Sequence, residues 1–381
     1  MRLASFNVEN LFSRAKAFDA EDGAAAKRAL DAFAEFNALI AAAEYGEAEK
    51  QRIHELIETL GLQRSDDGEF VRLRQNRGEF LVRRRGGALD IVAGGRGDWT
   101  GWLELEREPV DDTAMRMTAR VVRDVGADVF GIVEAENRPA LKGFSDAILP
   151  LVDAEPYARV MLIDGNDPRG IDCALMARGG FPIASMLSHV DDTDDAGIVF
   201  SRDCPEYHLD TNEGRLVVLV NHFKSKSGGS RSSSDRKRRR QAAAVARIYG
   251  RLREAGNDLV AVVGDLNDTP PEGADDPLAP LLRDTDLTDI SALDGHDDGG
   301  RPGTYGDSAA SNKIDHILLS PALRERAGAS GLFRRGMWPG VRPVKWETYP
   351  EIDPRQGGEE RHAASDHAAL WVDLDLRPRS A

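Results

Sequence analysis

The sequence LVAVVGDLND at residues 259–268 combines an apolar run with acidic and amide side chains at its end. An apolar run of this length, closed by a glycine, is typical of a buried β-strand. Asp265 and Asn267 are separated by one residue, so in an extended chain both side chains point the same way. We therefore predict a strand that delivers both side chains into one site, with a simple turn as the alternative interpretation.

Six further apolar runs end in polar residues in the same manner. Together with 259–263, they predict strands at residues 3–6, 129–133, 173–176, 216–220, 314–319 and 368–372. Helical stretches at 113–125 and 241–253 precede two of these strands. This alternation predicts a layered α/β fold whose reactive side chains lie at strand ends, where residues distant in sequence can meet.

Residues 14–110 break the alternation and predict an inserted subdomain. Apolar residues at helical spacing predict a helical hairpin that bends near Tyr45 and Gly46: Phe33, Phe36, Ile40, Ile53, Leu56, Ile57 and Leu60. A β-hairpin is predicted next, with strands at 70–74 and 80–85 joined through 76–78. Its arginines either grip a phosphate backbone or balance the acidic surface: Arg72, Arg74, Arg77, Arg83, Arg84 and Arg85.

The charge of the chain bears on its partners. The 381 residues carry a net charge of −15, and 41% are hydrophobic, which predicts a globular protein with a sizeable core. An acidic chain does not coat nucleic acid constitutively, because that affinity comes from neutralising phosphates with Lys and Arg. Local positive charge is nevertheless present in the run RKRRR at 236–240. A Gly- and Ser-rich loop is predicted before it, at 225–234.

The cysteine content and the N-terminal sequence bear on the cellular compartment of the protein. Cys173 and Cys204 are the only cysteines and do not form a CxxC pair, so a disulfide framework is not expected. The N-terminus has no charged-then-apolar leader, and no apolar stretch reaches the length of a membrane span. We therefore expect a cytoplasmic protein that does not bind membranes.

The polar residues at the strand ends suit one kind of chemistry. Carboxylate and amide oxygens favour Mg²⁺ or Mn²⁺ over zinc, and hydrolysis of a phosphodiester needs such a cation together with a base for water and donors for the oxyanion. The candidate oxygen ligands are Asn7, Glu134, Asp265, Asn267 and Asp366, and the candidate imidazoles are His222 and His367. Glu136 rivals Glu134, since alternation would place both on one face. Each residue taken singly could instead be structural, as a turn, a cap or a core histidine.

His367 needs a carboxylate partner from another strand. It follows Asp366 directly in sequence, and adjacent residues do not pair easily. A carboxylate beside an imidazole fixes its tautomer and raises its basicity. Asp315, at the start of the 314–319 run, is the expected partner.

Taken in order, the segments SFNVEN, GIVEAEN, RGIDCALMAR, NHFKSK, GDLNDT and IDHILLS with SDH resemble the endonuclease/exonuclease/phosphatase superfamily, whose members include DNase I-like nucleases. The resemblance covers residues 1–12 and about 113–376. It implies a four-layered α/β sandwich, with two packed mixed sheets flanked by helices and the helical and β-hairpin insertion outside the match.

The resemblance also implies roles for individual residues. Metal ligands fall on Glu134, Asp366, Asn7 and Glu9, and the catalytic group on His367, Asp315, Asp265, Asn267, His222 and Asp172, with Asp172 orienting His222. Arg202 resembles an arginine that binds substrate phosphate, and Arg169, Lys224, Arg238 and Arg239 are further candidates. The implied activity is a Mg²⁺- or Mn²⁺-dependent phosphodiesterase, most simply a nuclease acting on DNA or RNA.

Two departures and two rivals accompany this interpretation. Exonuclease III-like enzymes carry Asn at the position of His222, so the chain sides with the DNase I-like or sphingomyelinase-like branches, although the DNase I disulfides are absent. A phosphatase or a sphingomyelinase-like diesterase on a small phosphorylated substrate is the alternative enzyme. A nucleic-acid or partner-binding module without activity is the non-enzymatic alternative.

Overall fold

The computed structural model describes residues 1–9, 23–84, 88–106, 111–167, 169–226, 230–270 and 272–379. The chain divides into two compact units. The main unit comprises Met1–Phe12 and Asp111–Ala381, and the inserted unit comprises Ser13–Val110.

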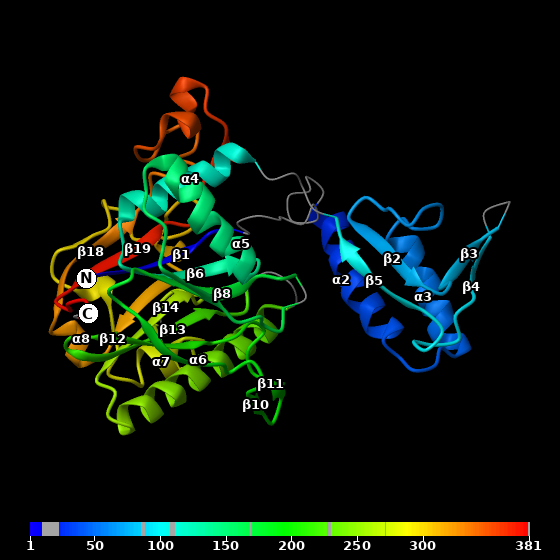
Figure 1. Cartoon of the computed structure of the whole chain (residues 1–381), viewed down its shortest axis with the longest axis horizontal. Helices are drawn as coiled ribbons and strands as arrows, with labels where there is room; N and C mark the ends of the chain where they lie inside the picture. Colours follow the sequence, from blue (N-terminus) through cyan, green and yellow to red (C-terminus); the bar gives the residue numbers. More distant parts are fainter. Residues whose placement is uncertain are drawn as a thin grey trace. The chain divides into compact units, whose positions relative to one another are not determined.

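Two large mixed sheets form the centre of the main unit (Figure 1). The first has the order β16-β18-β19-β1-β6-β8-β7, with strands His296–Asp297, Ala327–Phe333, Ala369–Leu374, Arg2–Asn7, Val129–Ala135, Asp172–Ala177 and Arg159–Leu162. The second has the order β15-β17-β14-β13-β12-β9, with strands Thr288–Asp289, Asp315–Leu319, Leu259–Asp265, Gly214–His222, Glu206–Thr211 and Ile183–Leu187. A separate small pair joins β10 (Thr193–Asp194) and β11 (Gly197–Ile198). All seven strands predicted from apolar runs are confirmed.

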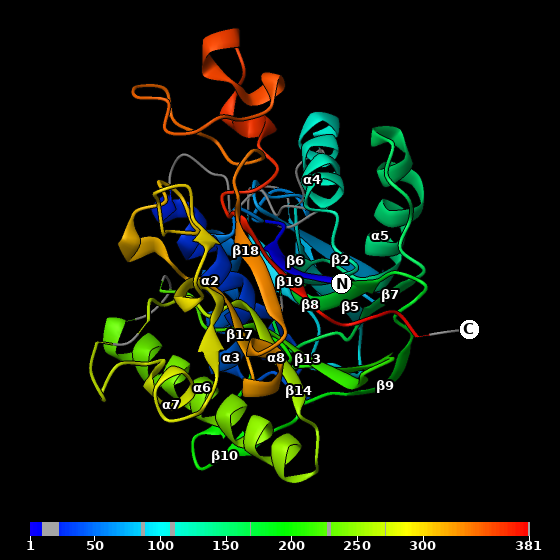
Figure 2. The ribbon, with the colours of Figure 1, turned by 90° about the vertical axis from the view of Figure 1, so that its left-hand side faces the viewer.

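Helices cover the outer faces of both sheets (Figure 2). They are α4 (Asp112–Val125), α5 (Arg138–Gly143), α6 (Arg231–Glu254) and α7 (Ala279–Leu282), whereas α8 (Pro321–Arg324) contacts β14 and β17 and buries Leu323 in the cluster between the sheets. One π-helical turn spans Phe144–Ile148, and short 3₁₀ turns span Leu149–Val152, Ile290–Ala292, Ala310–Asn312, Pro350–Ile352, Pro354–Gln356 and Glu360–His362. Helix α4 begins where Asp111 caps it, through hydrogen bonds accepted from the amides of Thr113 and Ala114.

Alternation along the strands divides the core into layers. In β6, Phe130 and Ile132 pack with α4, whereas Val129 and Val133 face the second sheet. In β14, Ala261 and Val263 face the first sheet, and Val260 and Val262 pack under α6. The order helix, sheet, sheet, helix is the four-layered α/β sandwich that was expected.

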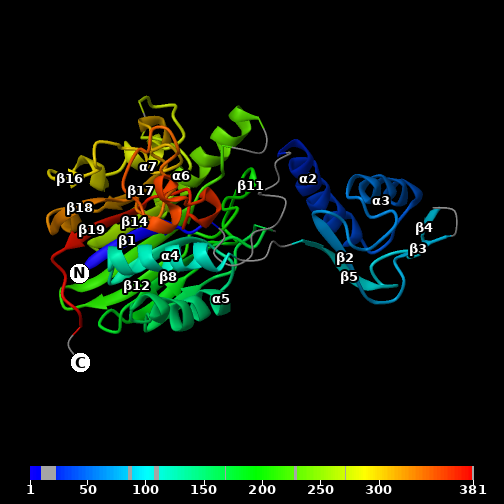
Figure 3. The same ribbon diagram turned by 90° about the horizontal axis from the view of Figure 1, so that it is seen from above.

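The first and last strands lie side by side in the first sheet (Figure 3). Strands β1 and β19 are antiparallel, and the amino group of Met1 donates to the carbonyls of Leu374 at 2.8 Å and Leu376 at 3.0 Å. Segments at opposite ends of the sequence are therefore held together at the sheet centre. This pairing places the SDH segment beside the end of β1.

The predicted loop at 225–234 is partly wrong. Helix α6 begins at Arg231, ten residues before the predicted start, and Ser230 caps it by accepting from the amide of Ser233 at 3.3 Å. A serine is a good N-cap, and the following Arg and Lys residues are good helix formers, so the cap outweighs the loop signal of the Ser cluster. The basic run is thus helical. Residues 227–229 lie outside the described residues.

The inserted unit contains the predicted helical hairpin, as α2 (Gly23–Ile40) and α3 (Glu47–Thr59). The predicted β-hairpin is wrong in its pairing. Strand β2 (Val71–Arg77) pairs with β5 (Thr100–Leu105), and β3 (Leu81–Arg83) pairs with β4 (Leu89–Ile91). The physical reason is burial, because Val71 and Leu73 of β2 and Leu103 of β5 lie in one hydrophobic cluster.

Four of the six predicted arginines pair with acidic residues within the inserted unit. Arg74 lies 2.7 Å from Glu104, Arg72 lies 2.9 Å from Glu106, and Arg83 lies 2.8 Å from Asp66. Arg84 pairs with Asp90. Arg85 lies outside the described residues. This geometry favours the interpretation that the arginines balance acidic neighbours.

Candidate active site

The predicted site residues lie at corresponding strand ends in both sheets. Strand β1 runs parallel to β6 in a register that pairs Asn7 with Val133, the residue before Glu134. In the second sheet, β13 runs parallel to β14 and pairs His222 with Asp265. Parallel strands end at the same edge of a sheet, and the packing of the two sheets brings both edges together.

A glycine positions Asp265. Gly264 has a φ of +130°, and a Cβ atom there would lie 2.0 Å from the carbonyl oxygen of Asn221 in the neighbouring strand. No other residue tolerates both the angle and the contact. Gly264 therefore allows β14 to remain paired with β13 while the side chain of the next residue, Asp265, points into the site.

Asn7 connects the two sheets. Its amide nitrogen lies 3.3 Å from Glu134 Oε1, 3.2 Å from Asp265 Oδ2 and 3.4 Å from His367 Nε2. Its amide oxygen accepts from the backbone of Glu9 at 3.0 Å. Asn7 therefore presents donors to the centre of the site, and in this arrangement it does not offer the oxygen that a metal ligand would need.

His367 pairs with Asp315 from the neighbouring sheet. Its Nδ1 atom lies 2.8 Å from Asp315 Oδ2, and the same oxygen accepts from Thr304 Oγ1 at 2.6 Å. Burial alone would lower the pKa of His367, but the Asp315 and Asp366 carboxylates outweigh it and raise this pKa well above its ordinary value. The imidazole is thus held in one orientation with its Nε2 edge toward Asn7.

Buried acids are crowded around this centre. The pKa of Asp265 is raised to about 8 by burial and by the charge of Asp315. Burial and the charge of Asp366 also raise the pKa of Glu134, against the opposing charge of His367. Carboxylates that repel one another in a dry site gain from a bound cation, so the donor set fits a divalent metal.

Two sets of residues could hold that ion. Asp265, Asp315 and His367 offer ligand atoms within 4.8 Å of one another. However, Asp315 and His367 already hydrogen-bond each other, and a protonated imidazole cannot ligate a metal. Glu134 and Asp366 interact electrostatically and supply oxygen donors, which a hard cation prefers. The carboxylate of Glu9 accepts from the backbone of Asp366 at 2.9 Å, which makes Glu9 a support for that residue.

Backbone strain marks the same place. Glu9, Glu134 and Asn267 have φ angles of +50°, +66° and +55°. Residues with a Cβ atom rarely occupy this region, and such conformations concentrate at functional sites. The angle at Glu134 accompanies a register shift between Val133 and Ala135, so the strand does not continue in regular alternation toward Glu136. The alternation argument that made Glu136 a rival therefore fails.

The expected hydrogen bond between Asp172 and His222 is not formed in this structure. The Nδ1 atom of His222 and the Oδ2 atom of Asp172 have no hydrogen-bond partner among the described residues. Asp172 instead accepts from the amide of Gly165 at 2.8 Å, and burial raises its pKa to about 7. His222 Nε2 faces Glu134 at 3.6 Å and Asp265 at 3.8 Å. Burial and the charges of Arg202 and Arg169 lower the pKa of His222 well below its ordinary value, so this imidazole is neutral.

The sequence profile of the endonuclease/exonuclease/phosphatase family matches residues 92–286. The chain belongs to this family. Members of the superfamily hydrolyse phosphoester bonds and typically depend on a divalent metal. None of the curated proteins matches the chain.

Several solved structures of the superfamily are similar to the chain. A mannosyl-6-phosphatase from Bacteroides thetaiotaomicron is 19% identical with a TM-score of 0.49, over 68% of this chain and 90% of that one. A truncated Caenorhabditis elegans TDP2 is 13% identical with a TM-score of 0.46, over 68% and 89%. The human Nocturnin catalytic domain is 15% identical with a TM-score of 0.46, over 71% and 88%.

Two arginines of this family member border the site. Arg202 is buried and lies 2.9 Å from Asp167, which also binds Arg169 at 2.7 Å. Arg202 donates to the carbonyl of Phe223 at 3.2 Å, immediately after His222. The charges of both arginines lower the pKa of His222, and the charge of Arg202 opposes the rise in the pKa of Glu134.

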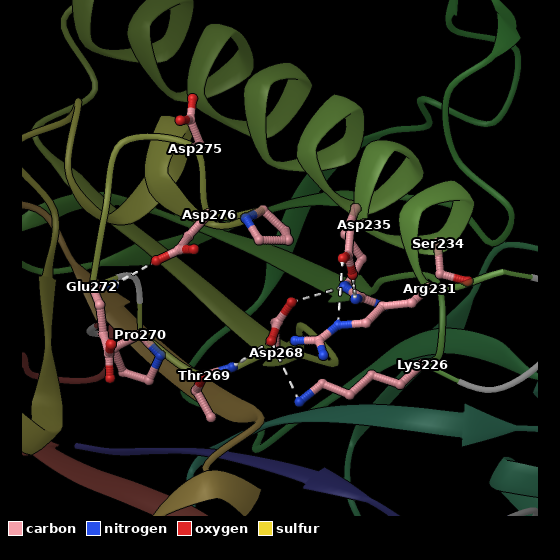
Figure 4. A pocket seen from close by; sticks show the side chains of 12 residues that line it. Lys226, Arg231, Ser234, Asp235, Asp268, Thr269, Pro270, Glu272, Asp275 and Asp276 are labelled. Atoms are coloured by element: carbon pink, nitrogen blue, oxygen red, sulfur yellow. Dashed lines mark hydrogen bonds and ion pairs between the residues drawn. The ribbon is translucent and has the colours of Figure 1, made fainter.

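The expected substrate arginines on α6 are not available to substrate in this structure. Arg238 is 2% exposed, lies 3.0 Å from Asp268 and also pairs with Asp235. Figure 4 shows Asp235 and Asp268 with Lys226, which lies 3.4 Å from Asp268. Arg239 donates at 2.9 Å to the carbonyls of Ala274 and Asp276. The basic run is dense in the sequence, but Arg238 and Arg239 are already bound to nearby carboxylates and backbone carbonyls.

Sequence reasoning missed three supporting residues. Thr304 bonds Asp315, and the ring of Tyr305 lies 4.9 Å from that of His367, centroid to centroid. Both lie in GTYG at 303–306, outside any apolar run, so strand patterns give no signal for them. Ser365, the first residue of SDH, had no predicted role, and it donates to the carbonyl of Asn7 at 2.7 Å.

Within the described residues, no helix combines the length and apolar character that crossing a bilayer requires.

Proposed function

We propose that this chain is a divalent-metal-dependent phosphodiesterase and that its substrate is DNA or RNA. The observation that carries the proposal is the convergence on Asn7, whose amide nitrogen lies within 3.4 Å of Glu134, Asp265 and His367. These side chains come from both sheets and from both ends of the sequence. A structural core gains nothing from gathering acids whose pKa values rise as a result.

Glu134 and Asp366 are the residues that would hold Mg²⁺ or Mn²⁺. Such a cation neutralises negative charge on the phosphate during hydrolysis. Its charge would also offset the repulsion between the buried carboxylates. A cation bound to Asp366 would offset one of the negative charges that raise the pKa of His367. This pKa would then fall toward neutral pH, where an imidazole acts as a general base.

His367 is the group that would accept the proton of the attacking water. Asp315 holds its Nδ1 atom and stabilises the charge that then develops on the ring. Asp265 orients the same water, as its carboxylate lies 4.0 Å from His367 Nε2. In this proposal the water attacks phosphorus in line with the leaving oxygen.

Donors around the centre would bind the phosphate oxygens. Asn7 presents its amide hydrogens, and Asn267 is fixed by a bond from its amide nitrogen to the carbonyl of Phe223 at 3.2 Å. His222 is neutral and can donate from Nε2. Donors that are fixed before the reaction stabilise developing charge without a cost of reorganisation.

A substrate panel tests the proposal. Plasmid, single-stranded DNA, RNA, an aryl phosphodiester and inositol phosphates would each be incubated with Mg²⁺, with Mn²⁺ and with chelator. We expect cleavage of nucleic acid and of the aryl diester that chelator abolishes. Release of phosphate from small monoesters alone would indicate a phosphatase, and failure with every substrate would overturn the proposal.

A further inference from the structure

A basic pocket lies beside the candidate active site in the main unit. Its volume is about 470 Å³, within the ~300–1,000 Å³ typical of small-ligand sites. Its lining includes Ser201, Lys224, Ser234, Arg236, Lys237 and Arg240, and no acidic residue among those that the structure describes. In a chain with 65 acidic residues against 50 basic ones, a lining of this kind selects for an anion.

The pocket shares its inner wall with the active site. Lys224 follows Phe223, whose carbonyl accepts from both Asn267 and Arg202. Ser201 precedes Arg202 in sequence. The backbone that binds the Asn267 and Arg202 side chains therefore also forms one wall of the pocket. A phosphate in the pocket would lie a short distance along the substrate from the phosphate that is hydrolysed.

The cations of the pocket differ in how far they are engaged. Arg240 is bound to Asp194 and to the carbonyl of Gly197 at 2.9 Å. Lys237 donates one hydrogen to the carbonyl of Ile198 at 2.5 Å, which leaves its other donors for a ligand. The exposed Arg236 side chain forms no hydrogen bond or ion pair within the part of the chain that the structure describes.

A buried hydroxyl points to a missing ligand. Ser234 is 2% exposed, and its Oγ atom has no hydrogen-bond partner among the described residues. It lies in the first turn of α6, where unsatisfied backbone amides favour anions. In Figure 4 its hydroxyl points away from Asp268. A buried hydroxyl without a partner is destabilising, and an anionic acceptor would satisfy it.

The electrostatics agree with this placement. Burial and the charges of Arg202 and Arg169 lower the pKa of Lys224, and burial and Arg240 lower that of Lys237. A bound anion would relieve this crowding of positive charge. A neighbouring cavity of about 710 Å³ shares Ser234 but contains Asp235, Asp268, Glu272, Asp275 and Asp276, so it is a poor site for phosphate.

We propose that the pocket between Lys224 and the first turns of α6 binds a second phosphate group of the substrate, next to the one that is hydrolysed. The inference rests on the proposed phosphodiesterase function. A polynucleotide supplies that phosphate from its adjacent nucleotide, and a small polyphosphorylated molecule supplies it from a monoester.

The test compares substrates with one and with several phosphates. An aryl phosphodiester has one phosphate, and oligonucleotides of DNA and RNA have several. For Arg236→Ala/Lys237→Ala we expect kcat/KM on oligonucleotides to fall at least tenfold and that on the aryl diester to stay unchanged. The slope of log affinity against log salt should decrease by about 1–2, because each basic side chain that no longer neutralises a phosphate reduces it by roughly one.

The matched control is Arg247→Ala. Arg247 is an exposed residue of the same helix, roughly 16 Å further along its axis at 1.5 Å per residue. It should behave as the unmodified chain does. If the double variant and the control cleave oligonucleotides equally well, the pocket proposal is wrong while the phosphodiesterase function stands.

A binding measurement separates the two proposals. Fluorescence anisotropy of a labelled oligonucleotide in chelator reports affinity without turnover, and Arg236→Glu should weaken it more than Arg247→Ala does. Because the Arg236 side chain is exposed and unpaired among the described residues, its replacement should leave the melting temperature unchanged. Inositol hexakisphosphate is then added as a competitor. If it displaces the oligonucleotide, and if Arg236→Glu weakens its binding too, the pocket also binds phosphate monoesters. Affinity that Arg236→Glu does not alter would overturn the inference.

Discussion

The Nδ1 atom of His367 lies 2.8 Å from Oδ2 of Asp315, although 52 residues separate them in sequence. Segments of different sheets supply the two side chains. Thr304 holds the same Asp315 oxygen from the other side. The imidazole is thus oriented before any substrate arrives, and this relationship leads to the first prediction.

Replacing either member of this pair should slow turnover with little change in KM. We expect His367→Ala and Asp315→Asn each to reduce kcat by roughly a hundredfold, the usual scale for lost acid–base catalysis. His296→Ala is the control, since His296 bonds Ser330 at 2.9 Å, at the far edge of the first sheet. Steady-state kinetics on the aryl diester would check this, and a fall in kcat below twofold in either variant would remove the pair from the mechanism.

Glu134 and Glu136 are two residues apart but should behave differently. Glu134→Gln should raise the Mg²⁺ or Mn²⁺ concentration for half-maximal activity by about 10–100-fold, because a carboxylate ligand is lost. Glu136→Gln should leave it unchanged. A second readout needs no activity: Glu134→Gln removes a crowded buried charge and should raise the melting temperature of the metal-free protein. An equal metal requirement in both variants would contradict the assignment.

Arg238 should contribute to stability and not to substrate binding. Arg238→Ala leaves the Asp268 and Asp235 carboxylates without their partner, and breaking a buried ion pair in this way costs about 3–5 kcal/mol. Arg239→Ala removes bonds to two carbonyls and should cost less. Urea unfolding monitored by circular dichroism measures both. A stable Arg238→Ala variant with weakened oligonucleotide binding would instead make Arg238 a substrate-binding residue.

The acid stability of the main unit should depend on Glu206. Burial would raise the pKa of Glu206, but hydrogen bonds with His189 and His208 lower it to about 2. The folded pKa lies below the unfolded value of about 4.5, so the stabilisation is fully present above pH 4.5 and is lost as the pH falls toward 2.

Glu206→Gln should therefore lower the free energy of unfolding at pH 7 by roughly 3 kcal/mol, from about 1.4 kcal/mol for each unit of pKa. The deficit should shrink as the pH falls below 4.5. Glu35→Gln is the control, because its pair with Arg52 is exposed to solvent and should contribute little to stability. Urea unfolding at several pH values gives the comparison, and a deficit that does not depend on pH would show that the Glu206 charge is not its source.

Much of the fold could be predicted because it follows from local patterns. The run at 259–263 becomes a strand since its residues are apolar on both faces, and buried strands between two layers need this. Asp265 ends up in the site because it closes that strand, whereas Asn267 lies beyond the strand end with a φ of +55° and donates its backbone amide to Asp265 at 2.8 Å, as in the turn of the alternative interpretation. The pairing of β2 with β5, in contrast, depends on Leu73 packing opposite Leu103, 30 residues away, which no local turn signal reports.

The sequence by itself determined which residue types end each strand, and so the chemistry that the chain can perform. Only the tertiary structure decided which of them meet: it pairs His367 with Asp315, leaves His222 without Asp172, and engages Arg238 with Asp268 while Arg236 stays exposed. The physical reason is that an ion pair or hydrogen bond depends on distances of a few ångströms between side chains. The packing of the two sheets and of α6 sets those distances, and they cannot be calculated from the spacing of residues in the sequence.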